Sequence, residues 1–364
     1  MYQKPVRCFS PMGTDYSVLL TGFEPFGGHK TNISQIVVLA MAGSRTLTCP
    51  WTGSPLRVHV ETDVLSVDSK GAQRTSERLH QGERWDAILH VGLCDACEVP
   101  RIERLAQDKL HMRLPDNAGR QVLGATIDDA GDRGCWVDPT VWATERFPST
   151  YTISVDAGAY LCNETYHATL KALCEVEAST PLPSPALFLH LPGENHLQIS
   201  EAEDFVMTCL AYLLRPYPVD PVHVVAAAVG QPEGYLVTRR SLDETEGGCW
   251  EFPGGKCEVG ENWKQATARE IREELELEVK PFHPLGSWYR VRGSDAFVIH
   301  LVSCTLEDAV EPSLSVHDAY EWISASGDAS LSWAGRDGEM NAFLQQHIKP
   351  MLPTHHHHSS NAHR

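Results

Sequence analysis

The stretch GGKCEVGENWKQATAREIREELELEV, residues 254–279, decides the fold of the C-terminal part of the chain. It predicts a glycine-rich turn followed by a helix over residues 263–277. Glu270, Glu273 and Glu274 stand at relative spacings of zero, three and four, which places them on one face of that helix. Like charges at such spacings repel each other and cost roughly a few tenths of a kcal/mol per pair. The pattern therefore indicates either a solvated acidic face or a bound cation.

The second possibility has a specific chemistry. Hard divalent cations such as Mg²⁺ prefer oxygen ligands, and three carboxylates on one rigid helix would supply them. Gly254 and Gly255 would let the backbone approach a metal or a ligand closely. A metal held in this way can bridge phosphate oxygens and activate a water. The acidic helix alone is compatible with both interpretations.

Length and charge limit the classes of function. A chain of 364 residues favours two domains. The formal net charge of −18 disfavours non-specific binding to nucleic acid or to an anionic membrane, but it allows a small phosphorylated substrate beside a cation. The N-terminus lacks an apolar signal core and no segment resembles a membrane span, so we expect a cytoplasmic protein. The sequence does not indicate the oligomeric state.

The 11 cysteines are scattered and lack the framework of a small disulfide-stapled domain. The C-x-x-C run at Cys94–Cys97 has no second pair at the spacing of a zinc site, so we do not expect a metal or redox role there.

The tail at 351–364 is polar and contains four consecutive histidines, and the sequence does not show whether they are native. We expect this tail to be disordered.

Short apolar strands alternate with amphipathic helices in the first part of the chain. This pattern favours an α/β domain with a mainly parallel sheet flanked by helices. The expected strands are 17–21, 56–65, 87–91, 151–155 and 186–191, and the expected helices are 34–42, 70–81, 163–177 and 202–214.

The proline-rich run RPYPVDPV then marks a domain boundary. After it the pattern becomes α+β with a mixed sheet, with strands at 222–229, 235–240, 288–291 and 296–304 and a closing helix at 339–347. The expected division is an N-terminal extension at 1–16, a first domain at 17–215, a linker at 216–221, a second domain at 222–350 and the tail.

The spacing of the glycine and acidic residues, read from Gly255, is G-x5-E-x7-R-E-I-x-E-E. It resembles the Nudix box, and WEFPGGK at 250–256 is similar to the MutT-like branch of the Nudix hydrolases. The resemblance spans about 222–348 and implies a mixed sheet sandwiched by helices. It departs at Glu276, where the family usually has glycine.

This resemblance implies roles for individual residues. The expected ligands of Mg²⁺ or Mn²⁺ are the Gly254 carbonyl and the carboxylates of Glu270, Glu273 and Glu274, with Glu273 also counted as catalytic. Arg269 would orient the carboxylates, Glu261 would support the loop and Asp337 would contact the base. The reaction would be attack of water on a nucleoside diphosphate-linked substrate, most simply a nucleoside triphosphate. Which nucleotide is cleaved stays open.

Many Nudix enzymes take a further glutamate from a late loop. The matching loop here is SVHDAYEW, residues 315–322, and the expected position falls near Val316. The sequence therefore lacks this carboxylate, and His317 and Asp318 are the candidates to replace it.

The first domain places a cysteine near a predicted helix start, in YTISVDAGAYLCNETYHATL at 151–170. A helix N-terminus favours the thiolate of Cys162, although a small buried residue is the alternative. GFEPFGG at 22–28, Glu103 in RIERLAQDK and His190 in ALFLHLP complete a pattern that resembles pyroglutamyl peptidase I, a cysteine peptidase.

The resemblance covers about 17–214 and implies that Cys162 attacks the carbonyl of an N-terminal pyroglutamate. His190 would take and return the proton, and Glu103 would orient His190. The expected lactam-binding residues are Phe23 and Phe26, and Arg113 in RLPDN matches an arginine near the family's active site.

The run VGLCDACEV at 91–99 departs from the glycine-rich run of the family and lies near the expected substrate pocket. Three hypotheses follow. The first is a bifunctional hydrolase acting on pyroglutamyl peptides and on a nucleotide. The alternatives are a Nudix hydrolase whose first domain is an inactive binding or scaffold module, and a non-enzymatic sensor.

Overall fold

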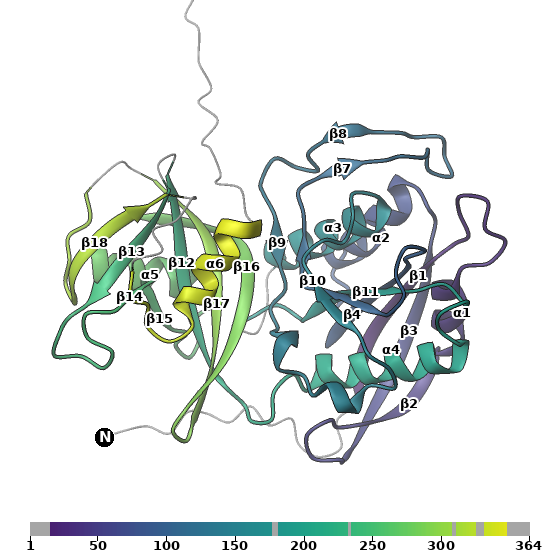
Figure 1. The fold of residues 1–364 in the computed structure, drawn as a ribbon, viewed down its shortest axis with the longest axis horizontal. Coiled ribbons are helices and arrows are strands. Elements are labelled where there is room, and N and C mark those ends of the chain that lie inside the picture. The colour runs from purple at the N-terminus through teal and green to yellow at the C-terminus, as the bar shows by residue number, and fades with distance from the viewer. Residues whose placement is uncertain (1–14, 177–180, 232–233, 308–310, 325–330, 348–364) are drawn as a thin grey trace, which may run out of the picture.

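The structure is a computed structural model that describes residues 15–176, 181–231, 234–307, 311–324 and 331–347. The chain forms two lobes, one on each side of Figure 1, and the expected α/β and α+β fold classes are both confirmed. Most of the expected N-terminal extension and the whole histidine-containing tail lie outside the described residues. None of the helices in the described parts combines the length and the apolar character needed to cross a bilayer.

A seven-stranded sheet forms the N-terminal domain, in the order β10-β5-β11-β4-β1-β3-β2. Its strands are β1 (Tyr16–Phe23), β2 (Gly43–Thr48), β3 (Pro55–Leu65), β4 (Ala87–Leu93), β5 (Arg101–Glu103), β10 (Thr152–Ser154) and β11 (Ala186–Leu191). The pairs β1–β3, β1–β4, β4–β11 and β5–β10 are parallel, whereas β2–β3 and β5–β11 are antiparallel. The sheet is therefore mainly parallel, as expected.

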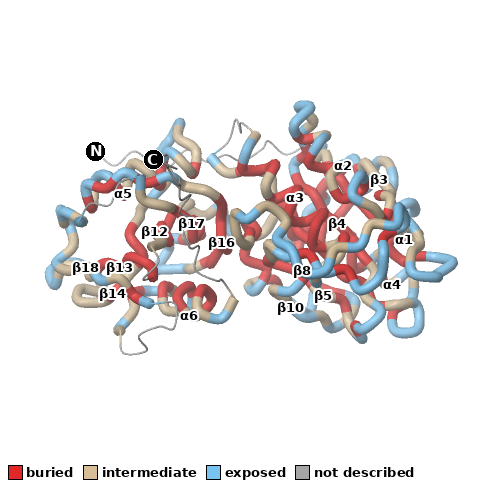
Figure 2. The backbone as a smooth tube through the Cα atoms, turned by 90° about the horizontal axis from the view of Figure 1, so that it is seen from above, coloured by how far each residue is buried: buried red, intermediate tan, exposed pale blue. Residues whose placement is uncertain are grey.

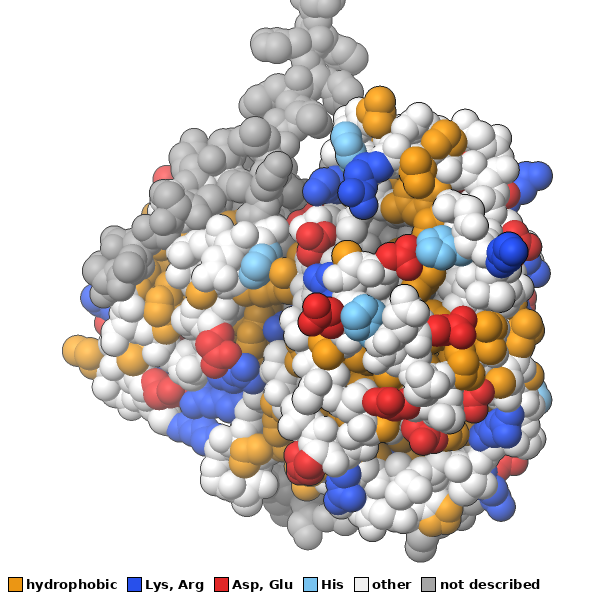
Figure 3. Space-filling model, turned by 45° about the vertical axis from the view of Figure 1, so that its right-hand side comes forward, with side chains coloured by type: hydrophobic (Ala, Val, Ile, Leu, Met, Phe, Trp, Pro, Cys, Tyr) orange, Lys and Arg blue, Asp and Glu red, His pale blue; other side chains and the backbone are white. Residues whose placement is uncertain are grey.

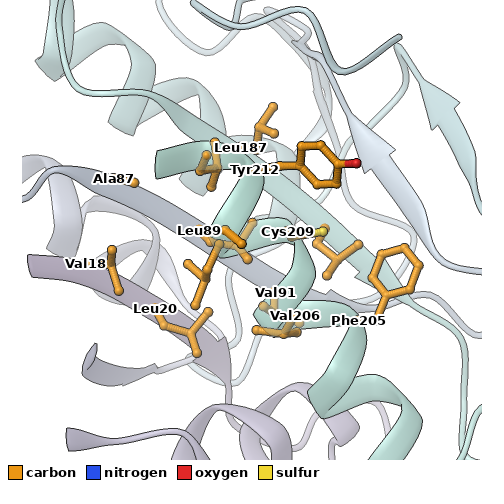
Figure 4. Close-up of a cluster of buried hydrophobic side chains, with 14 of the residues drawn as sticks. Val18, Leu20, Ala87, Leu89, Val91, Leu187, Phe205, Val206, Cys209 and Tyr212 are labelled. Carbon is orange, nitrogen blue, oxygen red and sulfur yellow. The ribbon is translucent and has the colours of Figure 1, made fainter. Parts of the chain in front are cut away.

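Helices cover both faces of this sheet, as Figure 1 shows. One face carries α1 (Ile33–Ala40) and α4 (Ile199–Leu214), and the other carries α2 (Ser69–His80) and α3 (Leu161–Glu175). Figure 4 shows the first of these layers, where Leu20, Leu89 and Leu187 from three strands meet Phe205 and Val206 from α4. Burial on both faces explains why the central strands read as continuous apolar runs rather than alternating ones.

Short strands lie between β5 and α3. They form two small antiparallel pairs, β6 (Leu105–Ala106) with β9 (Arg133–Gly134) and β7 (Leu110–His111) with β8 (Leu123–Ala125). Two short 3₁₀ turns follow, at Pro139–Val141 and Thr144–Arg146. These elements and the edge strand β2 did not follow from the sequence pattern, because they are short or largely exposed and have no clear apolar period.

A mixed sheet forms the C-terminal domain, in the order β14-β13-β12-β17-β16, with β15 paired to β12 and β18 paired to β13. The strands are β12 (Val222–Gln231), β13 (Gly234–Arg240), β14 (Trp250–Glu251), β15 (Gly254–Lys256), β16 (Val279–Arg292), β17 (Asp295–Leu306) and β18 (His317–Ile323). The helices are α5 (Trp263–Leu275) and α6 (Asp337–His347). Ala266, Ile271 and Leu275 of α5 are fully buried against the sheet.

The strand β16 is much longer than the expected 288–291 segment. Its pairing with β17 is irregular between Pro281 and His283 and again between Pro284 and Gly286. A proline cannot donate to a ladder, so two prolines within six residues mask a strand in the sequence. Bulges beside them let the pairing continue.

Glu276, at the position where the family usually has glycine, forms the turn that ends α5. Glu276 caps α5 in the left-handed conformation, with φ of 53°, and its N–H donates to the Arg272 carbonyl. This conformation is the one that glycine adopts without steric cost. The turn that ends the helix is thus kept without the glycine.

The two domains share a buried interface that the sequence did not predict. The Trp136 and Trp263 rings lie 5.0 Å apart, and β9 of the first domain packs beside β16 of the second. In the view of Figure 2, β16 is the C-terminal strand that faces the N-terminal domain. Leu105 of the first domain is part of a hydrophobic cluster formed by the second. The chain therefore folds as two domains with a common core region.

The face of the N-terminal domain in Figure 3 carries lysine and arginine side chains scattered among aspartate and glutamate. Charges of both signs alternate with hydrophobic side chains on this face. Its field is therefore of mixed sign, although the chain as a whole is strongly acidic.

Candidate active sites

Two strands bring together the acid and the base of the first candidate site. β5 and β11 are antiparallel, and this pairing places Glu103 next to His190 although they are 87 residues apart in the sequence. His190 Nδ1 and Glu103 Oε1 are 2.9 Å apart, and Glu103 is completely buried. A buried carboxylate held against one ring nitrogen fixes the orientation of the imidazole.

The nucleophile comes from a helix. Cys162 lies in the first turn of α3, because the helix starts at Leu161 and not at the expected residue 163. Its free thiol is partly exposed and hydrogen-bonds with His190. The structure thus brings Cys162, His190 and Glu103 into one chain of contacts, in the arrangement of a cysteine nucleophile with its base and orienting acid.

Gly92 makes room for this arrangement, and sequence reasoning missed it. It pairs in register with His190, and a Cβ atom at Gly92 would stand 3.0 Å from Cys162 Sγ and 2.9 Å from the Phe188 ring. Any side chain here would push the nucleophile or the aromatic ring aside. A glycine at the end of a buried apolar strand was the available signal.

The protonation of His190 fits the role of a proton carrier. Burial alone would lower its pKa, but hydrogen bonds with Cys162 and Glu103 outweigh burial and raise the pKa of His190 to about 9. The charged imidazolium of His190 is therefore favoured at neutral pH. Cys162 and Glu103 stabilise this charged form by hydrogen bonding and by electrostatic attraction.

The aromatic residues expected to contact a lactam divide into two groups. Phe23 is only 3% exposed and packs against Phe188, with ring centroids 6.2 Å apart. Phe26 is partly exposed and stacks on Tyr160, the residue that precedes α3, at 5.8 Å. Tyr160 was not expected from the sequence, and it brings an aromatic face close to Cys162.

Arg113, which the sequence suggested near this site, lies in the segment between β7 and β8. Its side chain is exposed, and its carbonyl accepts a hydrogen bond from Gln121 Nε2 at 3.1 Å. The role of Arg113 therefore stays a prediction.

The second candidate site is an open cleft of about 740 Å³ beside the second half of α5. Its lining comes from the glycine-rich strand, the turn after it and one face of the helix, and consists of 254–259, Arg269, Glu270, Glu273 and Glu274. A side chain at Gly255 would overlap the Glu270 carboxylate. The three helix glutamates thus share one cleft with the glycine-rich backbone, as their spacing predicted.

Arg269 organises the acidic side of this cleft. Its guanidinium makes two contacts of 2.9 Å with Glu261, and it lies 2.9 Å from Glu270 and 3.1 Å from Glu273. Glu274 is positioned separately, because its Oε2 accepts the Gly254 N–H at 3.1 Å. Burial raises the pKa of Glu274 to about 7, against the opposing charge of His317.

The oxygen-rich donor set of this cleft fits a hard divalent cation. Glu273 is the most exposed of the three carboxylates and faces solvent, whereas Glu270 and Glu274 are partly buried. Arg269 holds Glu270 and Glu273 on its own guanidinium, so these ligands are neutralised by a positive charge from their own helix. The donor chemistry of the cleft thus agrees with a divalent cation, and the assignment of these carboxylates as its ligands stays a prediction.

The two substitutes for the missing loop carboxylate have different surroundings. Asp318 pairs with Arg239 at 2.6 Å on the exposed side of β18. His317 has a side chain only 4% exposed, and its Nε2 lies 3.1 Å from Glu251 Oε1. Of the two candidates, His317 is the one whose charge lowers the pKa of Glu274, against the effect of burial.

Asp337 begins α6 and is nearly buried. Its Oδ1 accepts the Phe252 N–H at 2.8 Å, next to the strand that leads into the glycine-rich turn. Burial raises the pKa of Asp337 to about 8 despite this hydrogen bond. At neutral pH the carboxyl group is therefore mostly protonated, and it can donate as well as accept.

A further group of possible metal ligands lies elsewhere. Within the described residues, Asp108, Asp128 and His167 are the three side chains whose ligand atoms all lie within 4.8 Å of one another. Asp128 also pairs with Arg133 at 2.7 Å and with Lys171 at 3.0 Å. Asp128 is therefore part of an ion-pair cluster in the segment before β9.

Comparison with known proteins agrees with this division. The model of the pyroglutamyl peptidase family matches residues 16–212, and that of the NUDIX domain matches residues 220–329. A pyrrolidone-carboxylate peptidase of Pyrococcus furiosus is 28% identical over 180 residues, which cover 48% of this chain and 80% of that protein. One of Brevibacillus brevis is 25% identical over 187 residues, with 48% and 78% covered.

Among solved structures, the pyrrolidone carboxyl peptidase of Fervidobacterium islandicum AW-1 is 26% identical. The match covers 55% of this chain and 99% of that one, with a TM-score of 0.47. The family model of the peptidase covers more than half of the chain, and the second family model begins where the first domain has ended. The chain belongs to the pyroglutamyl peptidase family and carries a C-terminal Nudix domain.

Proposed function

We propose that the chain is a bifunctional hydrolase whose first domain removes N-terminal pyroglutamate from peptides. The observation that carries this proposal is the connected group of Cys162, His190 and Glu103. The relatives named as pyrrolidone-carboxylate peptidases support the same activity, since the pyroglutamyl peptidase family model matches residues 16–212, which contain this group.

The thiolate of Cys162 attacks the carbonyl carbon of the pyroglutamyl residue. Negative charge then develops on the carbonyl oxygen, and N–H groups in the first turn of α3 would donate hydrogen bonds to it, because a helix start leaves such donors free. His190 gives its proton to the departing amine as the peptide bond breaks. A water then attacks the acyl-enzyme, His190 takes the water proton, and the thiol is released with free pyroglutamate. Glu103 holds the imidazole in orientation throughout.

The lactam ring would lie against the exposed face of Phe26 and Tyr160. Phe23 is buried beneath them, so its part is to support the wall of the pocket rather than to touch the substrate. This differs from the role expected from the sequence, which treated Phe23 and Phe26 alike.

We further propose that the second domain hydrolyses a nucleoside diphosphate-linked substrate, most simply a nucleoside triphosphate. The Gly254 carbonyl and Glu270, Glu273 and Glu274 would hold Mg²⁺ or Mn²⁺, which when bound would screen the phosphate charges and activate water. Arg269 holds the carboxylates in place, and Glu261 anchors Arg269. Asp337, mostly protonated at neutral pH, can present both a donor and an acceptor to a base.

The peptidase proposal is tested with a fluorogenic pyroglutamyl amide and the full chain, under conditions in which alkylation shows Cys162 to be free. Wild type should release the fluorophore, and Cys162→Ser should lower kcat by roughly 10³-fold. The partly exposed Cys249, which lies in the other domain, gives the matched control Cys249→Ser with unchanged activity. Wild type that releases no fluorophore would refute the proposal.

The Nudix proposal is tested with a panel of nucleoside triphosphates in the presence of Mg²⁺, with phosphate and pyrophosphate as products. Glu273→Gln should lower turnover by about 10²-fold or more. It should also weaken Mn²⁺ binding measured by calorimetry. Glu276→Gln, which alters an exposed glutamate outside the cleft, is the control. Unchanged turnover and Mn²⁺ affinity in Glu273→Gln would overturn the assignment of this residue.

A scaffold role of the first domain has its own supporting observation. The first domain buries Leu105 and Trp136 against the second, so it stabilises the Nudix fold whether or not it is catalytic. Nucleotide hydrolysis by wild type together with no action on pyroglutamyl amides would favour this alternative.

A further inference from the structure

A disulfide joins Cys94 and Cys97 on the loop that follows β4, at the edge of the peptidase-like site. The sequence had not predicted a bond between these two cysteines. The loop is attached to the catalytic strands, because the Cys94 N–H donates to the Leu191 carbonyl directly after His190. The proposed peptidase mechanism uses neither of the two cysteines, so the bond has another purpose.

Arg101 connects the disulfide to the catalytic acid. Its Nη1 donates to Cys97 Sγ at 3.5 Å, and its Nε lies 3.9 Å from Glu103 Oε1. Arg101 also stands opposite His190 in the register of β5 and β11. A disulfide sulfur is a weak acceptor, whereas a thiolate binds a guanidinium through a charge-assisted hydrogen bond. Reduction of Cys97 therefore draws Arg101 toward the sulfur and away from Glu103.

Asp95 connects the same loop to the aromatic wall. It stands between the two cysteines and pairs with His29 at 2.9 Å. The ring of His29 lies 6.1 Å from that of Phe26, which in turn stacks on Tyr160. Closing the loop by the disulfide restricts Asp95, and through His29 it restricts the segment that carries Phe26. Opening the disulfide releases this second connection.

We propose that Cys94 and Cys97 are a redox-active pair that sets the efficiency of the peptidase site. In the disulfide form Arg101 stays beside Glu103 and the aromatic wall is held in place. In the reduced form Arg101 moves to the Cys97 sulfur and the aromatic wall is loosened. This inference rests on the proposed peptidase function. Because the aromatic wall would receive the lactam, most of the effect should fall on KM.

The chemistry is an ordinary thiol–disulfide exchange. A dithiol reductant supplies two electrons and two protons, the Cys94–Cys97 bond breaks, both sulfurs become thiols and the reductant becomes a disulfide. The Cys97 thiol then gives its proton to solvent, and the resulting thiolate binds the Arg101 guanidinium. A disulfide oxidant such as oxidised glutathione reverses the step. Cys94 is partly exposed and Cys97 is 6% exposed, so an external thiolate would attack the sulfur of Cys94.

The test uses the full chain in glutathione buffers of graded ratio. Differential alkylation with peptide mass mapping gives the fraction of Cys94–Cys97 disulfide, and only buffers in which Cys162 remains free are used. We expect kcat/KM on a fluorogenic pyroglutamyl amide to be about fivefold or more higher in the disulfide form and to follow the mapped fraction. The Cys94→Ser/Cys97→Ser double variant should keep the lower value in every buffer, whereas Cys249→Ser should respond as wild type does.

The rate at which iodoacetamide alkylates Cys162 provides a readout without substrate. It should differ severalfold between the two forms of wild type, which requires no mutation and therefore no assumption about the folding of a variant. A change in this rate without any amide hydrolysis would refute the peptidase function and keep the coupling. Equal rates and equal kinetics in both forms would refute the coupling, as would mapping that finds both cysteines as thiols in every buffer.

Discussion

His190 shows how single residues set the chemistry of the first site. Its imidazole is buried, yet the pKa is raised to about 9 because Cys162 and Glu103 stabilise the charged form more than burial destabilises it. A pKa raised above its ordinary value of 6.5 contributes stability that is complete below pH 6.5 and is lost as the pH rises through 9. The proton that charges His190 is also the proton that His190 would give to the leaving amine.

Replacing Glu103 should therefore move the pH dependence of the peptidase. In Glu103→Gln the imidazolium loses one of the two neighbours that stabilise its charge, so the pKa of His190 falls while Cys162 still raises it. We expect the alkaline limb of kcat/KM to shift to lower pH by about one unit or more, with a loss of about 10²-fold at the optimum. Rates on a pyroglutamyl amide between pH 5 and 10 would show this. An unshifted alkaline limb would mean that Glu103 does not act on His190.

Glu276 has a backbone conformation that is unfavourable for any residue with a Cβ atom. It adopts φ of 53°, a region where a residue with a Cβ atom is strained. Glu276→Gly should raise the free energy of unfolding by about 0.5–1 kcal/mol, measured with urea. Glu276→Ala removes the same charge and keeps the Cβ atom, so it should bring no such gain. Equal stabilisation by both substitutions would show that charge, and not conformation, is the cause.

Among the elements, β9 and β16 connect the two folds. Two residues form β9, and one of them, Gly134, lies so close to Leu285 of β16 that a Cβ atom would overlap the Leu285 backbone. Backbone atoms cannot turn away as the end of a side chain can. The close approach of these strands therefore depends on a glycine that no local pattern distinguishes.

Adding one methyl group at this contact should loosen the domains. Gly134→Ala should lower the free energy of unfolding by about 1–3 kcal/mol, because the two strands must separate. Gly193→Ala is the matched control, since a Cβ atom there meets nothing within 4 Å and the φ angle is not in the left-handed region. Thermal unfolding of the two variants would compare them directly. Equal stability would show that β9 and β16 can move apart without cost.

At the scale of the whole molecule, Asp138 is the polar centre of the domain interface. It is fully buried, and its Oδ2 accepts the Tyr289 N–H at 2.9 Å and lies 3.0 Å from Arg336. Both partners belong to the second domain. Since a buried polar group without its partner is costly, this cluster makes the relative position of the domains specific.

Removing the Asp138 side chain should uncouple the two domains. Asp138→Ala leaves the Tyr289 N–H and the Arg336 guanidinium without their acceptor, at a cost of about 3 kcal/mol. Calorimetry should show a single transition for wild type and two separated transitions for the variant. Glu339→Ala, which removes an exposed partner of the same arginine, should keep one transition. A single transition in Asp138→Ala would indicate that the apolar contacts alone couple the domains.

The sequence by itself determined the two fold classes and the chemical groups of both sites. Residue periodicity is a local property, so it specified most of the longer helices and the central strands. The spacing of Glu270, Glu273 and Glu274 also fixed their common face, because a helix converts sequence distance directly into direction. The strand–turn–helix pattern around Cys162 likewise placed this cysteine near the start of a helix.

Only the tertiary structure decided how distant segments meet. The contact between Glu103 and His190, the space that Gly92 leaves for Cys162, and the Cys94–Cys97 disulfide beside them depend on which strands pair and how their loops close. The domain interface around Asp138 likewise joins segments about 150–200 residues apart. Such pairings are set by the burial and hydrogen bonding of the whole chain, and the identity of neighbouring residues does not encode them.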